Sequence, residues 1–105
     1  MATFDRSDVT LLSPAELAAE LGLRVRRERL RQDLTQRTLA ARAGVARVTV
    51  TRMEADGTAT LSSFLAVLSA LRRTGDLAEL LEPPPAVSLD EFVAAGEPTR
   101  RRGRR

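Results

Sequence analysis

The stretch TQRTLAARAGVARVTVTRMEADG, residues 35–57, is the part of the sequence that most restricts the fold. Its apolar spacing predicts two short helices, at about residues 36–43 and 47–55. Gly44 lies between them and can adopt the left-handed backbone conformation that ends a helix in a tight turn. Ala40 leaves space where the helices cross, because a bulky side chain there would push them apart. The pattern therefore predicts two helices held at a fixed angle around a glycine-containing turn, locked together by Val45, Val50 and Met53.

Three further helices are expected around this pair. The first starts at the capping box Ser13-Pro14-Ala15-Glu16 and runs to about Gln32, with Leu17, Leu21, Val25 and Leu30 on its apolar side. Another is expected at about residues 61–72, with an apolar stripe of Leu61, Phe64, Leu65, Leu68 and Leu71. The last restarts at Gly75-Asp76, with Leu77, Leu80 and Leu81 facing inward. The predicted fold class is all-α, a compact five-helix domain.

The chain divides into three parts. Residues 1–12 have no clear period and are expected to form an N-terminal arm, extended over DVTLL. Residues 13–82 hold the five-helix domain. Residues 83–105 begin with three prolines, which cannot continue a helix and favour an extended spacer. A short segment and a basic tail, RRRGRR, follow this Pro-rich linker.

The residue types that are missing exclude several classes of function. There is no Cys and no His, which removes disulfides, thiol nucleophiles, the usual zinc ligands and the best proton-transfer side chain near neutral pH. The acidic residues Asp56, Asp76, Glu79 and Glu82 show no spacing of paired carboxylates or metal ligands. We therefore expect no enzyme activity, no metal and no cofactor. Neither a membrane-spanning run nor a signal-peptide pattern is visible, so a cytoplasmic protein without membrane contact is expected.

Charge is distributed unevenly along the chain. All 17 basic residues are Arg, yet the net charge is only +3. Residues 24–52 hold nine Arg against Glu28 and Asp33, a net charge of +7, whereas residues 54–82 carry −3 and the final RRRGRR carries +5. This asymmetry is typical of a protein that binds a polyanion. A solvated Arg-rich face would have the same composition, so charge alone leaves the choice open.

The sequence resembles the phage-repressor-like (Xre/Cro) helix-turn-helix family over about residues 21–71. The residues that carry the resemblance are Leu21-Gly22, Val25, Arg29, Thr35-Gln36, Leu39-Ala40, Gly44-Val45, Val50, Met53 and Glu54. The resemblance implies a bundle of about five helices that binds double-stranded DNA. It also implies a partly buried ion pair between Arg29 and Glu54, which fixes helix orientation more than it adds stability. Gln36, at a helix start, is implied to lie against a DNA phosphate.

One face of the helix at residues 47–55 is the predicted reading surface. With Val50 and Met53 inside, the opposite face presents Arg47, Val48, Thr51 and Arg52 to the major groove. Arg47 can reach a guanine edge with two parallel hydrogen bonds, Val48 can contact a thymine methyl, and Arg52 can read a second base or hold a phosphate. Contacts with the DNA backbone are expected from Thr49 and, at the loop that approaches a phosphate in the family, from Ala55. The plain alternative for each is an exposed side chain on a charged helix, and for Arg24, Arg27 and Arg31 that alternative is preferred.

The sequence departs from the family pattern at both ends of this helix. Ala46 stands where the family usually has a Ser cap, which costs about 1 kcal/mol of stability. The loop after Glu54 reads Ala-Asp-Gly where a shorter turn is common.

Three functions remain open at this point. The first is a sequence-specific transcriptional repressor that binds a palindromic operator as a homodimer, since one module reads few bases. Its dimer surface is expected in the last helix or in residues 86–95. The second is a HipB-type antitoxin that represses its own operon and binds a kinase-like toxin through Val87 to Gly96. The third is an architectural or coactivator protein without sequence choice, whose binding would fall steeply with salt for every DNA. RNA binding is disfavoured because no aromatic platform is available for stacking.

Overall fold

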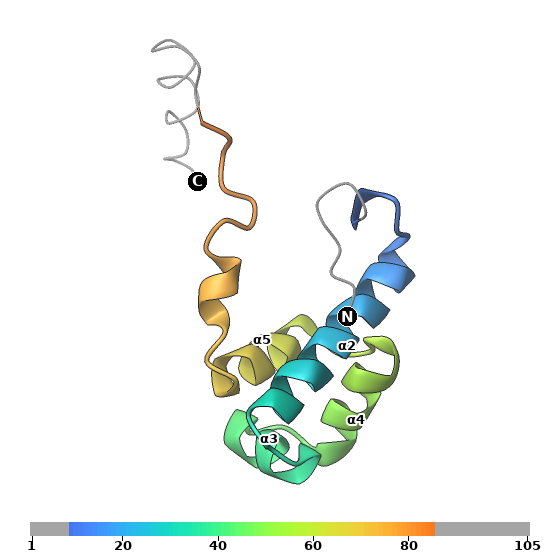
Figure 1. Ribbon diagram of the computed structural model, residues 1–105, viewed down its shortest axis with the longest axis vertical. Helices are drawn as coiled ribbons and strands as arrows, with labels where there is room; N and C mark the ends of the chain where they lie inside the picture. Colours follow the sequence, from blue (N-terminus) through green and yellow to red (C-terminus); the bar gives the residue numbers. More distant parts are fainter. Residues whose placement is uncertain (1–8, 86–105) are drawn as a thin grey trace, which may run out of the picture.

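The computed structural model describes residues 9–85 of the 105-residue chain, and the regular structure within this range is entirely helical. Besides a helical turn at Val9 and Thr10, it consists of α2 (Pro14–Arg31), α3 (Gln36–Ala43), α4 (Arg47–Asp56) and α5 (Leu61–Ala70), followed by a short 3-10 turn, η1 (Thr74–Leu77). Figure 1 shows the long α2 crossing the domain, with α3 at its C-terminal end. α4 packs against α2, and α3 contacts both α4 and α5. No helix in this range is long and apolar enough to cross a membrane.

Local signals fix the ends of the helices. The Ser13 hydroxyl accepts a hydrogen bond from the Glu16 N–H at 3.1 Å, and Glu16 Oε1 accepts one from the Ser13 N–H at 2.8 Å. This is the predicted capping box, with Pro14 in the first turn of α2. The side chains of Thr35 and Thr60 cap α3 and α5 in the same way. α2, α3 and α4 therefore begin where the sequence predicts, and their ends agree within one residue.

The core lies where α3, α4 and α5 meet the C-terminal half of α2. Its completely or almost completely buried residues are Val25, Leu39, Ala40, Val50, Met53, Val67 and Leu71. Each large apolar side chain that is buried in this way contributes roughly 1.5–3 kcal/mol to folding. The core therefore positions α4 through Val50 and Met53, as the apolar spacing predicts.

Two glycines let α4 approach α2 closely. A Cβ at Gly22 would collide with the carbonyl oxygen of Met53, and a Cβ at Gly57 would collide with that of Ala18. Gly57 also ends α4 with a positive φ of 81°. Because both obstacles are backbone atoms that cannot move aside alone, α2 and α4 are held together at a separation that only glycine permits.

The predicted fifth helix is wrong. After α5 ends at Ala70, Arg72 takes a positive φ, and only the four-residue turn η1 follows before irregular turns. Leu80 and Leu81 do not face inward, because they are 66% and 94% exposed. Few residues lie between the end of α5 and Pro83. A helix this short is not stable unless it packs against a neighbouring element.

The predicted apolar stripes of α2 and α5 are also partly wrong. Leu21 and Leu30 of α2 and Leu61 and Leu65 of α5 are exposed. The buried face of α2 instead consists of Gly22, Val25, Glu28 and Arg29, and that of α5 includes Val67. A four-residue spacing shows which apolar residues share one face of a helix. Packing against the neighbouring helices decides which face is buried.

The terminal predictions lie mostly outside the described residues. Within the predicted extended arm, Val9 and Thr10 are helical, and the Leu12 N–H donates to the Val9 carbonyl at 3.2 Å. This part of the arm prediction is wrong, since a local turn satisfies these backbone groups. Predictions for residues 1–8, for the segment at 86–95 and for the RRRGRR tail fall on residues that the structure does not describe.

Candidate nucleic-acid interface

A tight turn joins α3 to α4. Gly44 has φ 72° and ψ 30°, the left-handed conformation predicted for it. Its N–H donates to the Ala41 carbonyl at 3.3 Å, and the Val45 N–H donates to the Ala40 carbonyl at 3.0 Å. Because Ala40 is buried at the crossing and has only a methyl group, the two helices pack directly against each other. The turn and the crossing together fix the direction in which α4 points.

α4 has two distinct faces. Val50, Met53 and Glu54 are buried. The four residues predicted to read bases all lie on exposed positions, namely Arg47, Val48, Thr51 and Arg52. Ala55 is also exposed, and Thr49 is half-buried at the edge between the two faces. α4 thus presents a continuous outer surface of two guanidinium groups, an aliphatic side chain and a hydroxyl, while its inner face is held by the core.

A bidentate ion pair ties the inner face of α4 to α2. Arg29 Nε lies 2.7 Å from Glu54 Oε2, and Arg29 Nη2 lies 2.9 Å from Glu54 Oε1. The remaining nitrogen, Nη1, donates to the Leu34 carbonyl at 2.8 Å. Both side chains are more than nine-tenths buried. With its charge paired and a hydrogen bond from each of its three nitrogens, this arginine sets the rotation of α4 about its axis.

Gln36 extends this network to the outer face. Its Nε2 donates to Glu54 Oε1 at 3.1 Å, and its Oε1 accepts from the Thr51 hydroxyl at 3.0 Å. The Thr51 hydroxyl also lies 3.2 Å from the Arg47 carbonyl. A chain of polar contacts therefore runs from Arg29 on α2, through Glu54 and Gln36, to an exposed residue of α4. The family resemblance implies a phosphate contact for Gln36, and no feature of the sequence indicated that its side chain bridges α3 and α4.

The exposed arginines differ in whether a carboxylate neutralises them. On α2, Arg24 and Arg27 lie within ion-pair distance of Glu20, and Arg31 pairs with Glu28. In the part of the chain that the structure describes, the arginines of α3 and α4 form no ion pair; they are Arg37, Arg42, Arg47 and Arg52. Arg26 of α2 and Arg72 after α5 also form no ion pair within residues 9–85, so four of the six unpaired arginines lie on the two helices that flank the Gly44 turn.

Arg52 has an acidic neighbour but no direct contact with it. Hydrogen bonds from Thr58 lower the pKa of the Asp56 carboxyl, and the charge of Arg52 lowers it further. Asp56 Oδ1 accepts the Thr58 N–H at 2.9 Å, just after the last turn of α4. The Asp56 carboxylate therefore stabilises the turn after α4. The guanidinium N–H groups of Arg52 remain available to another partner.

The comparison with known protein families agrees with this geometry. A family described as helix-turn-helix, of the Xre/Cro type, matches residues 25–77, which is about half of the chain. The chain belongs to the Xre/Cro-type helix-turn-helix family. No curated protein gave a significant match. As a member of this DNA-binding regulatory family, which is not an enzyme family, the protein is a DNA-binding transcriptional regulator.

A second buried charge lies at the other side of this helix-turn-helix domain. Hydrogen bonds from the Arg31 side chain lower the pKa of Glu28 to about 2 against the opposing effect of burial, with help from Gln32 and the charge of Arg73. Arg73 Nη1 lies 2.9 Å from Glu28 Oε1, and Gln32 Nε2 donates to the Leu71 carbonyl at 2.9 Å. These contacts attach the end of α5 to α2. The sequence analysis missed them because Glu28 and Arg73 are 45 residues apart.

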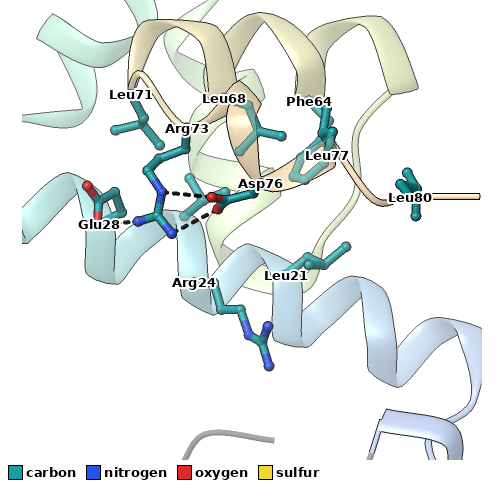
Figure 2. Close-up of a pocket in the computed structure, with 11 residues that line it drawn as sticks. Leu21, Arg24, Glu28, Phe64, Leu68, Leu71, Arg73, Asp76, Leu77 and Leu80 are labelled. Carbon is teal, nitrogen blue, oxygen red and sulfur yellow. Dashed lines mark hydrogen bonds and ion pairs between the residues drawn. The ribbon is translucent and has the colours of Figure 1, made fainter. Parts of the chain in front are cut away.

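An apolar hollow of about 370 Å³ separates α2 from α5 and η1 (Figure 2). Leu21, Phe64, Leu68, Leu77 and Leu80 line it, and the ion pairs of Arg73 with Glu28 and Asp76 lie at its rim. No residue of α3 or α4 lines this hollow. The helix-turn-helix domain therefore has an apolar surface that is separate from its unpaired arginines.

Proposed function

We propose that the protein is a sequence-specific repressor that binds a palindromic operator as a homodimer, with α4 in the major groove. The observation that carries this proposal is the outer face of α4. It combines unpaired Arg47 and Arg52 with Val48 and Thr51, on a helix whose inner face is fixed by the core and by Glu54. A rigidly positioned helix with free donors on its outer face suits direct reading of base edges.

The individual base contacts follow from the order of residues along α4. Arg47 is the first residue of the helix, and its guanidinium can donate two parallel hydrogen bonds to guanine O6 and N7. Val48, which is 51% exposed, offers an apolar contact for a thymine methyl. Arg52 lies one helical turn after Val48 and can reach a second base or a phosphate. Arg47 is therefore the main determinant of specificity in this proposal.

Phosphate contacts are proposed for residues around these base readers. α3 begins at Gln36, and of its first N–H groups the Thr35 side chain accepts only that of Thr38. The N–H groups of Gln36 and Arg37 therefore remain available for a phosphate, where the positive end of the helix dipole favours an anion. Thr49 and Ala55 border the reading face and are proposed to lie along the DNA backbone.

A homodimer is proposed because one helix-turn-helix module reads too few base pairs for selectivity in a genome. The exposed Leu21 and Leu80, which line the hollow beside η1, supply an apolar surface for it. This surface includes Leu80, one of the residues predicted to belong to a fifth helix. The alternative of a HipB-type antitoxin depends on residues 87–96, which lie outside the described range, so no contact in residues 9–85 favours a toxin partner.

Selection of bound sequences from a random DNA pool tests the proposal. The expected result is a palindromic consensus whose two halves are centred about one helical turn apart, since a twofold dimer places its two α4 helices in successive major grooves. Enrichment without any consensus, together with equally steep salt dependence for all sequences, would overturn it in favour of an architectural protein.

A further inference from the structure

We infer that Thr51 acts toward DNA as a hydrogen-bond acceptor, and so selects a base that carries an amino group, adenine or cytosine, over guanine or thymine. Gln36 is a positioning residue that, together with the Arg47 carbonyl, keeps the Thr51 proton directed toward the protein. The inference rests on the proposed reading of DNA by α4, and it adds which chemical group one of the reading residues recognises.

The direction of each hydrogen bond in the network follows from its buried end. Arg29 can only donate, and the ionised carboxylate of Glu54, paired with it at 2.7 and 2.9 Å, can only accept. The group of Gln36 that lies 3.1 Å from Glu54 must therefore be the amide nitrogen. This fixes the orientation of the amide, which a lone glutamine would leave ambiguous. The carbonyl oxygen of Gln36 consequently faces Thr51.

The proton of Thr51 is directed toward the protein. The hydroxyl has one hydrogen, and both of its protein neighbours are acceptors, Gln36 Oε1 at 3.0 Å and the Arg47 carbonyl at 3.2 Å. Whichever of them takes the proton, the oxygen lone pairs are left for the exposed side. Turning the proton outward would give up the one hydrogen bond that it makes to these acceptors, which contributes on the order of 1 kcal/mol.

The major groove offers both kinds of partner at a base edge. Adenine N6 and cytosine N4 donate, whereas guanine O6 and thymine O4 accept. An outward lone pair on Thr51 matches the amino groups and repels the keto oxygens. Thr51 therefore discriminates amino from keto bases on the strand that it contacts, rather than recognising a single base.

Parallel DNA selections with the wild type and the variants Thr51→Val and Thr51→Ser test this inference. Valine keeps the shape and the methyl group but lacks the hydroxyl, whereas serine keeps the hydroxyl. In each wild-type half-site, one position should carry adenine or cytosine on the contacted strand, preferred about 3- to 10-fold over keto bases, as expected for one hydrogen bond. Thr51→Val should lose that preference while the other positions keep theirs, and Thr51→Ser should retain it.

The variant Gln36→Leu tests the positioning role. Removal of its carbonyl takes away the shorter of the two inward contacts, so the Arg47 carbonyl alone holds the Thr51 proton and keto bases should become partly tolerated at the same position. The ratio between amino and keto bases is compared within one protein preparation, which cancels any general loss of folded protein. A merely structural role for Gln36 would lower binding to all sequences and leave this ratio unchanged.

The outcomes separate the inference from the function on which it rests. Absence of any consensus for the wild type would reject both. Because every base pair places an amino base on one strand and a keto base on the other, base analogues that lack either group identify which one Thr51 contacts. If loss of the keto oxygen, and not loss of the amino group, abolishes the effect of Thr51→Val, the acceptor role is rejected and the regulator remains. A consensus in which Thr51→Val changes no position would also reject the inference alone.

Discussion

Arg29 and Glu54, 25 residues apart in the chain, join α2 to α4 through two parallel hydrogen bonds of 2.7 and 2.9 Å. Almost no solvent reaches either side chain. The same carboxylate also accepts from Gln36, so a single buried group connects α2, α3 and α4. The helix that presents the unpaired arginines is thus oriented by a charge pair as well as by apolar packing.

Removal of one partner from this pair should destabilise the fold strongly. Glu54→Ala leaves the Arg29 guanidinium buried without its counter-ion, and we expect the free energy of unfolding to fall by about 3–5 kcal/mol. Urea denaturation followed by circular dichroism measures this. As a matched control, Glu20→Ala removes the partner of the exposed Arg24 and should change stability by less than about 1 kcal/mol. Equal effects of the two substitutions would contradict the structural role of Glu54.

The start of α4 can be improved. Ala46 is its N-cap residue, and no side chain there accepts a hydrogen bond from the first turn. Ala46→Ser supplies the missing acceptor and should stabilise the protein by about 0.5–1 kcal/mol, visible as a higher thermal midpoint. Ser13→Ala, which removes an existing cap, should shift the midpoint in the opposite direction. A neutral or lower midpoint for Ala46→Ser would show that this cap position cannot use a hydroxyl.

The contact between α2 and α4 should not tolerate a methyl group at Gly22. Gly22→Ala places a Cβ against the Met53 carbonyl oxygen, so the helices must separate, and we expect a loss of about 1–3 kcal/mol. Gly75→Ala is the control, because a Cβ at Gly75 meets no atom within 4 Å. Thermal unfolding of the two variants measures the difference, and similar midpoints would contradict the close approach of α2 and α4.

The acid sensitivity of the fold should depend on Glu28. Its pKa is about 2 in the folded protein against 4.5 in the absence of these contacts, so the unfolded state binds more protons between these values. Its stabilisation is complete above about pH 4.5 and is lost as the pH falls toward 2. Because the partners Arg31 and Arg73 are themselves largely exposed, we expect a contribution of about 1–3 kcal/mol.

Urea unfolding at pH 2.5, 4 and 6 measures this dependence. Glu28→Gln should make the free energy of unfolding less dependent on pH between about pH 2 and pH 4.5. Glu79→Gln, at an exposed position with no ion pair in residues 9–85, should leave the curve unchanged. An equally steep curve for Glu28→Gln would assign the acid sensitivity to other carboxylates.

The helix-turn-helix itself could be predicted because its signals are local. The cap at Ser13, the turn at Gly44 and the inward pair Val50 and Met53 each act within a few residues of sequence. The fifth helix was predicted from the spacing of Leu77, Leu80 and Leu81, but spacing does not show whether a neighbour will cover that face. The apolar stripes of α2 and α5 failed for the same reason.

The polar network of the interface could not be predicted, since its members meet only in the folded domain. Gln36 and Thr51 are 15 residues apart, and Glu28 lies 45 residues from Arg73. The sequence showed that polar side chains occupy these positions. Their partners depend on the angle between α3 and α4 and on where the chain turns after α5.

The central claim is that the outer face of α4 reads DNA sequence, and Arg47→Ala tests it most directly. Affinities for the selected operator and for an unrelated duplex are measured at one salt concentration. The account predicts that Arg47→Ala lowers the affinity for the selected operator about 10-fold or more, because one guanine in each half-site is no longer recognised. The affinity for the unrelated duplex should fall much less. Equal losses for both duplexes would contradict it, because Arg47 would then contribute charge alone.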